Sequence, residues 1–193
     1  MLESSPIYDE SGALSGAGVP AKKHETRAHV ELAPSKAHQW LNCPGSILLS
    51  RGVKDSSSVY ADEGTAAHEL GEKCLRSGGS PHDFIGQKIR VHKTDFEVDQ
   101  DMAENVCVYV NHVRSLQAAA GVGGLIESKF YLQKLNPPAL MGGTSDFTLH
   151  DKKARRLHVV DLKYGAGTLV DVVDNSQLKY YALGALTELE LQN

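Results

Sequence analysis

Hydrophobic side chains recur at helical spacing through the middle of the chain. In the run EVDQDMAENVCVYVNHVRSLQAA the apolar positions are three and four residues apart, as on one face of a helix. These positions are Val98, Met102, Val106, Val110 and Val113. The pattern predicts a long amphipathic helix that ends near Gly121.

Two shorter helices are expected before this one. Ser35 is placed to cap a helix that carries Trp40 and that Pro44 ends or kinks. Asp62 can cap a second helix, and His68 lies beside its apolar stripe. That stripe is Ala67, Leu70 and Cys74, and the glycines that close the helix are Gly78 and Gly79.

Beyond residue 121 the pattern changes to an alternation of apolar and polar positions, which is typical of strands. We expect strands at about 124–131, 141–149 and 156–164, and a short strand near 169–173. A last helix is predicted from about 175 to 190, with Asp174 and Gln177 spaced like a capping box. Helices, then strands, then a helix indicate a layered α/β or α+β domain.

Length and composition fit one domain and a tail. The chain has 193 residues, of which 41% are hydrophobic. Residues 1–27 are rich in Ser, Gly, Ala and charge and are expected to form a flexible leader, which leaves 28–193 as the domain. No apolar run is long enough to cross a membrane, and the three cysteines form no CxxC pair. These features favour the reducing cytoplasm and no membrane partner.

The net charge of -4 argues against binding to nucleic acid through bulk charge. Any contact with phosphates must therefore be local. The candidate patches are Lys88, Arg90 and Lys93, and Lys152, Lys153, Arg155 and Arg156. Ordinary solvated surface charge is the alternative for both patches.

Two aspartates are predicted to face each other across a hairpin. If the turn HDKKAR has its midpoint between Lys153 and Ala154, register counting places Asp146 opposite Asp161. Like charges on directly opposed strand positions destabilise a sheet unless something neutralises them. A divalent cation is the natural neutraliser.

Lys163 adds an amine to this pair. It follows Asp161 by two residues, so both side chains are expected on the same side of a strand. That strand is apolar on both faces and is expected at the buried centre of the sheet. Two carboxylates and an ammonium are the groups that metal-assisted phosphodiester cleavage needs. The alternative is a buried Asp161–Lys163 pair beside a surface Asp146.

Five segments resemble one family in its own order. GGTSDF, VVDLKYG and NSQLKYYALGAL resemble the core of RecB-like nucleases of the PD-(D/E)XK superfamily, in which an Asp after a Gly-Thr turn is followed by D-x-K and Q-x-x-x-Y. Upstream, EGTAAHEL and ESKFYL resemble that family's first motif and the strand before its core. LAPSKAHQWLNCPGS further resembles phage and prophage proteins of this group, and the nuclease that accompanies CRISPR adaptation.

The resemblance implies a restriction-endonuclease-like core, a central mixed β-sheet flanked by helices. It implies a metal-dependent DNA nuclease, an exonuclease of phage recombination or repair, with Mg²⁺ or Mn²⁺ as cofactor. DNA would be the substrate, and phage recombination or replication proteins would be further partners.

Carried onto this sequence, the resemblance assigns roles to seven residues. The metal ligands would be His68, Asp146 and Asp161, the catalytic lysine Lys163, the helper of metal or water Glu127, and the DNA-facing pair Gln177 and Tyr181. Taken singly, several of these residues have a structural alternative. His68 could be a core or surface histidine, and Glu127 a strand-edge charge paired with Lys129. Gln177 could be a helix cap and Tyr181 a core aromatic.

The chain departs from many members of this family in its last part. Those members continue with a further strand and a group of cysteines. These cysteines and the cysteine of a Cys-Pro pair like Cys43-Pro44 bind an iron–sulfur cluster. No cysteine follows Cys107, so no iron–sulfur cluster is expected within this chain, and Cys43 is expected in the core. We expect a truncated or naturally short version.

Two further functions stay open on the sequence alone. One is an inactive, nuclease-like module that binds DNA or protein; intact Asp146, Asp161 and Lys163 argue against it. The other is a metal hydrolase of another type, which would need clustered histidines, and the remaining eight show no HxxxH or HxH spacing.

Overall fold

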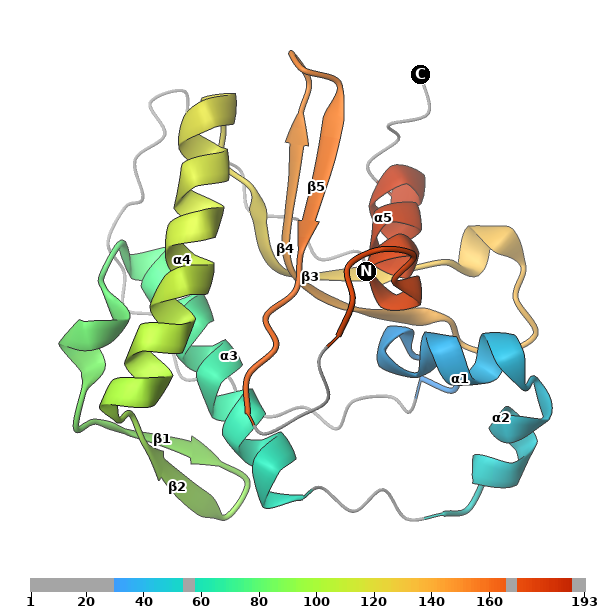
Figure 1. The fold of residues 1–193 in the computed structure, drawn as a ribbon. Helices are drawn as coiled ribbons and strands as arrows, with labels where there is room; N and C mark the ends of the chain where they lie inside the picture. The colour runs from blue at the N-terminus through green and yellow to red at the C-terminus, as the bar shows by residue number, and fades with distance from the viewer. Residues whose placement is uncertain (1–29, 54–57, 166–169, 189–193) are drawn as a thin grey trace, which may run out of the picture.

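The computed structural model describes residues 30–53, 58–165 and 170–188 (Figure 1). The predicted leader, residues 1–27, lies outside this part of the chain. The helices are α1 (Ala37–Asn42), α2 (Gly45–Ser50), α3 (Val59–Ser77), α4 (Gln100–Ala120) and α5 (Ser176–Glu188), with short 3-10 turns at Pro34–Lys36, Pro81–Phe84 and Gln133–Leu135. The strands are β1 (Lys88–Val91), β2 (Thr94–Glu97), β3 (Leu125–Tyr131), β4 (Gly142–Asp151) and β5 (Arg156–Val160).

A three-stranded sheet lies between two groups of helices. Its order is β3-β4-β5, and both pairings are antiparallel. Helices α3 and α4 lie on one side of the sheet and α5 on the other (Figure 1). The α+β class is confirmed. Within the described ranges the strand ladders are antiparallel, and the parallel pairing is one isolated bridge between Leu32 and Met141.

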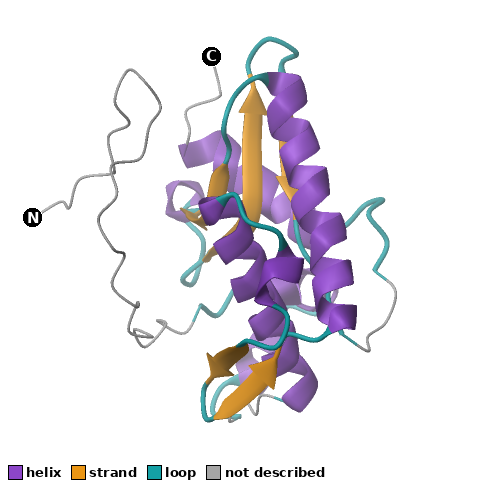
Figure 2. Cartoon of the chain, turned by 90° about the vertical axis from the view of Figure 1, so that its left-hand side faces the viewer, coloured by secondary structure: helices purple, strands orange, loops and turns teal. Residues whose placement is uncertain are grey.

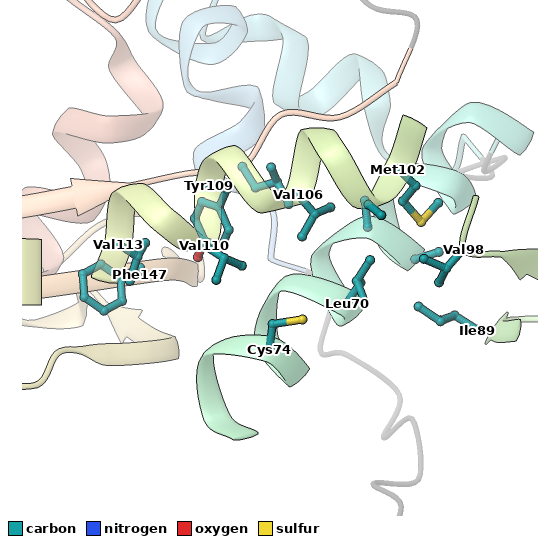
Figure 3. Close-up of a cluster of buried hydrophobic side chains, with 14 of the residues drawn as sticks. Leu70, Cys74, Ile89, Val98, Met102, Val106, Tyr109, Val110, Val113 and Phe147 are labelled. Carbon is teal, nitrogen blue, oxygen red and sulfur yellow. The ribbon is translucent and has the colours of Figure 1, made fainter. Parts of the chain in front are cut away.

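The core between α3, α4 and the sheet follows the helical stripe read from the sequence. The five predicted stripe positions from Val98 to Val113 are at most 2% exposed. They pack against Leu70 and Cys74 of α3 and Phe147 of β4 (Figure 3). Complete burial of each such side chain contributes about 1.5–3 kcal/mol. This core fixes α3 against the sheet and so fixes the position of His68.

A hairpin that the sequence analysis did not assign joins α3 to α4. Strands β1 and β2 pair with Lys88 opposite Glu97 and Val91 opposite Thr94. Ile89 and Val91 face the core, and Figure 2 shows the hairpin at one end of the molecule. An Asn-Gly or Asp-Gly pair, the usual sequence signal of a two-residue hairpin turn, is missing here. The turn is His92-Lys93 instead, and His92 adopts a left-handed φ of 52°.

Several predicted helix starts are wrong. The Ser58 side chain, not Asp62, caps α3 by accepting from the Ala61 N–H. Ser35 lies inside a 3-10 turn, and Lys36 occupies the cap position of α1 without a side-chain bond. At α5, Asn175 accepts from the Leu178 N–H. Asp174, predicted to form the capping box there, pairs instead with Lys179.

The third strand of the meander also differs from its prediction. Strand β5 ends at Val160 instead of residue 164, and within the described residues it lies at the edge of the sheet while β4 is central. Val159 packs against the cluster that holds Tyr180 and Tyr181 of α5, and Val160 packs against the core on the other side, which accounts for apolar residues on both faces. Residues 170–173 form no strand.

Two remaining expectations concern the surface. Cys43 is exposed instead of buried in the core. Within the described residues, no helix combines the length and apolar composition that crossing a membrane requires.

Candidate active site

The turn register predicted from the sequence is confirmed as far as the pair before the two aspartates. Asp151 pairs with Arg156 at the turn, and the ladder continues to Phe147 opposite Val160. Asp146 and Asp161 occupy the next positions on the two sides, where β5 has ended. The hairpin therefore brings both carboxyl groups to one level of the sheet.

Asp146 anchors the chain that leaves β5. Its Oδ2 accepts the Leu162 N–H at 2.6 Å and lies 3.2 Å from His68 Nδ1. The residue is 7% exposed, so these contacts are shielded from water. A buried carboxylate needs such partners, because leaving it unpaired costs several kcal/mol.

Three of the predicted residues form a compact donor cluster. His68 of α3, Glu127 of β3 and Asp146 of β4 each offer one ligand atom, and these atoms lie within 4.8 Å of one another. His68 stands on the turn of α3 that precedes the fully buried Leu70. Donors from three separate elements thus converge on one point.

Glu127 has an unusual backbone. Its φ is 50°, a left-handed value that side chains other than glycine rarely adopt. Ile126 pairs with Phe147 and Ser128 pairs with Ser145, so Glu127 stands opposite Asp146 at an interruption of the ladder. Such a conformation costs about 1–3 kcal/mol and is common at functional sites.

Asp161 is held from two sides. Its Oδ2 pairs with Lys163 Nζ, and its Oδ1 accepts from Gln177 Nε2 at 3.0 Å. Gln177 also lies 3.4 Å from the Tyr181 hydroxyl, one helical turn further along α5. The Asp161 side chain is 7% exposed, whereas that of Lys163 is 48% exposed. The pair therefore joins a buried carboxylate to an ammonium that reaches solvent.

The predicted residues divide into two adjacent groups. His68, Glu127 and Asp146 make the donor cluster, and Asp161, Lys163, Gln177 and Tyr181 make a hydrogen-bonded row beside it. The charge of Asp161 acts on His68, which places the two groups within electrostatic reach of each other.

Burial and charge shift two pKa values. Burial lowers the pKa of His68, but the hydrogen bond and charge of Asp146, with the charges of Glu127 and Asp161, outweigh it and raise the pKa above 6.5. Burial, and then the charge of Asp146, raise the pKa of Asp161 above 3.8, although Lys163 acts in the opposite direction. A cation bound close to these groups would act in the opposite direction and lower both pKa values.

Tyr109 of α4 lies near the site, although the sequence pattern was not used to predict it. It is 8% exposed and belongs to the core between α3, α4 and the sheet. Burial raises its pKa, and the charges of Asp146, Glu127 and Asp161 raise it further. A signal was present, because Tyr109 follows Val106 by three residues and so carries a hydroxyl on the buried stripe.

Lys163 also borders an open polar cavity of about 390 Å³. The other lining residues are Glu63, Asp101, Asn105, Tyr164 and Gly165. Tyr164 donates to Asp101 Oδ2 at 3.2 Å, and its burial and this bond raise its pKa to about 12. The cavity gives water access to the Lys163 ammonium.

A family model described as a protein of unknown function, DUF2800, matches residues 29–192. The chain belongs to this family. No solved structure matches the chain.

The donor set of this DUF2800 protein fits a divalent cation. Two carboxylates and one imidazole within 4.8 Å provide the oxygen ligands that Mg²⁺ and Mn²⁺ prefer and one nitrogen, which the transition metal accepts more readily. Asp161 is not among these three donors, and burial, followed by the charge of Asp146, raises the pKa of its carboxyl group.

Proposed function

We propose that this protein is a metal-dependent deoxyribonuclease that hydrolyses phosphodiester bonds in the cytoplasm. The observation that carries the proposal is the convergence of the donor cluster with the Asp161–Lys163 pair. These groups come from α3, β3, β4 and the segment that follows β5, and they combine carboxylates and an imidazole with a half-exposed cation. The resemblance to RecB-like nucleases supports the same function.

The bound cation would polarise a phosphoryl oxygen and lower the pKa of a water molecule. His68, Glu127 and Asp146 would hold it, and Asp161, which pairs with Lys163, would be a further carboxylate beside them. Gln177 keeps the Asp161 carboxylate oriented through its 3.0 Å hydrogen bond.

Lys163 supplies positive charge at the reacting phosphate. Its ammonium pairs with Asp161 and reaches the polar cavity, so it can contact a phosphate oxygen or the attacking water. In hydrolysis, the oxygen of water forms a bond to phosphorus, one P–O ester bond breaks, and the leaving oxygen takes up a proton. A preorganised cation stabilises the negative charge of that transition state.

The test is a cleavage assay on end-labelled linear DNA, covalently closed DNA and RNA of the same sequence. Each substrate is incubated with the protein and Mn²⁺, Mg²⁺ or EDTA. We expect cleavage of DNA with Mn²⁺ and none with EDTA. Lys163→Ala should lower the rate by about 10²–10³. Lys179→Ala is the matched control, because Lys179 of α5 also pairs with an aspartate, the exposed Asp174.

The outcomes separate this proposal from an inactive binding module. A protein that binds DNA but leaves all substrates intact with either metal is such a module, and the nuclease proposal then fails. Equal loss of rate in Lys163→Ala and Lys179→Ala also contradicts it, because only Lys163 adjoins the donor cluster.

A further inference from the structure

Four cations crowd the turn between β4 and β5. They are Lys152, Lys153, Arg155 and Arg156. All four residues are exposed, and none forms an ion pair with another described residue. The nearby Asp151 carboxylate is engaged in the turn itself, where its Oδ1 accepts the Ala154 N–H at 2.9 Å. We call these four residues the basic tip.

The basic tip gathers like charges on an acidic protein. The net charge is -4, and two exposed arginines elsewhere have acidic partners. Arg90 pairs with Asp95 at 2.8 Å, and Arg51 pairs with Glu31 at 2.8 Å. A run of unpaired like charges repels itself, so an anionic partner is the natural way to stabilise it.

The basic tip and the candidate site share one hairpin. The β4–β5 hairpin rises beyond the ends of α4 and α5 in Figure 1, and Figure 2 shows the same projection from the side. Asp146 lies on β4 five positions before Asp151. A strand advances about 3.4 Å per residue, so the tip lies roughly 17 Å from the carboxylates.

We infer that the basic tip binds the phosphate backbone of a DNA duplex whose scissile bond lies at the carboxylate site. This inference rests on the proposed nuclease function. At 3.4 Å per base pair, roughly 17 Å corresponds to about five base pairs. DNA presents phosphates all along that distance, which suits four adjacent cations, and contacts to phosphates position a duplex without reading its sequence.

The experiment compares two double variants in which lysines at hairpins become alanine. Lys152→Ala with Lys153→Ala removes charge from the basic tip. Lys88→Ala with Lys93→Ala removes the same charge from the β1–β2 hairpin, the other candidate patch, where both lysines are exposed and the neighbouring Arg90 pairs with Asp95. Arg155 is kept so that the substitutions avoid its left-handed backbone, which has a φ of 53°. Duplex DNA binding is measured by fluorescence anisotropy in EDTA at several salt concentrations.

The tip variant should show a salt dependence shallower by about 2 in the slope of log affinity against log salt, since each lost phosphate contact removes ~0.9. When salt is raised from 50 to 200 mM, the tip variant should therefore lose about tenfold less affinity for DNA than the wild-type protein loses. The β1–β2 variant should keep the wild-type slope. Equal slopes in all three proteins, equal reductions in both variants, or a wild-type protein without measurable affinity for DNA would overturn the inference.

Cleavage separates this result from a failure of the proposed function. With Mn²⁺, the tip variant should cleave duplexes that end within about three base pairs of the scissile bond at the wild-type rate, because they do not reach the tip. Longer duplexes should lose efficiency through a higher KM at unchanged kcat. If the wild-type protein binds DNA through the basic tip but never cleaves it, the result supports the DNA-binding surface and refutes only the proposed nuclease activity.

Discussion

Lys163→Ala separates a catalytic lysine from a structural one, and the structure sets the size of the expected effect. The Lys163 side chain is 48% exposed, so its pair with Asp161 resembles a surface ion pair on one side. Surface pairs contribute about 0.2–1 kcal/mol, whereas breaking a buried pair costs about 3–5 kcal/mol. Asp161 keeps its hydrogen bond from Gln177 after the substitution. We therefore expect a loss of unfolding free energy of at most about 1 kcal/mol.

Urea denaturation and the cleavage assay measure the two effects on the same variant. For a chain of this size, about 1 kcal/mol lowers Tm by about 2–4 °C, and about 3–5 kcal/mol would lower it by roughly 6–20 °C. The cleavage rate should fall by about 10²–10³, with metal binding retained. A folded variant with undiminished cleavage, or a loss of stability in the larger range, would refute the assignment of Lys163 as a catalytic residue.

Four further outcomes are expected. Mn²⁺ at about 100 times its Kd should stabilise the protein by about 2.7 kcal/mol, or about 5–11 °C in Tm, and Asp146→Ala should abolish this rise in differential scanning calorimetry. His68→Ala should stay folded and bind Mn²⁺ more weakly by isothermal titration; an unchanged isotherm removes His68 from the ligands. Because the folded-state pKa values of His68 and Asp161 are raised, their contribution to metal-free stability is present at low pH. This contribution is lost as pH rises above 3.8 for Asp161 and above 6.5 for His68. The affinity for Mn²⁺ should be higher at about pH 8 than at about pH 6, as isothermal titration at both pH values would measure. Tyr109→Phe should cleave DNA more slowly than wild type, while its unfolding free energy should stay within about 1 kcal/mol of the wild-type value. Equal cleavage rates would exclude a role for the Tyr109 hydroxyl.

The register of the site could be read from the sequence because a short turn determines it. Once the turn is centred between Lys153 and Ala154, antiparallel pairing leaves a single partner for each position. The long helix was predictable for a similar reason, since its five stripe residues match a periodic face that must be buried.

Neighbouring residues of similar chemistry made the helix starts harder to predict. Ser58 and Asp62 can both cap a helix, and α3 begins at the earlier one because Val59–Ala61 continue it toward the N-terminus. Asp174 and Asn175 compete in the same way. Capping preference alone does not decide between two such residues one turn or one position apart.

The position of β5 depended on tertiary packing that periodicity does not contain. Apolar residues on both faces of a strand indicate that both faces are covered, but they do not distinguish a central strand from an edge strand. Here β4 is central and α5 covers one face of β5. The left-handed Glu127 was equally out of reach, since a glutamate carries no local preference for a positive φ.

The end of β5 explains why the functional groups gather where they do. After Val160 the ladder stops, and the Leu162 N–H donates to the Asp146 side chain instead of to a backbone carbonyl. The chain is thereby turned away from β4 while it stays tied to Asp146, so Asp161 and Lys163 leave the strand beside the donor cluster. One oxygen of Asp146 thus shapes the backbone that carries the lysine. In the proposed metal site the same carboxylate would also bind the cation, which would couple the position of Lys163 to the metal ligands.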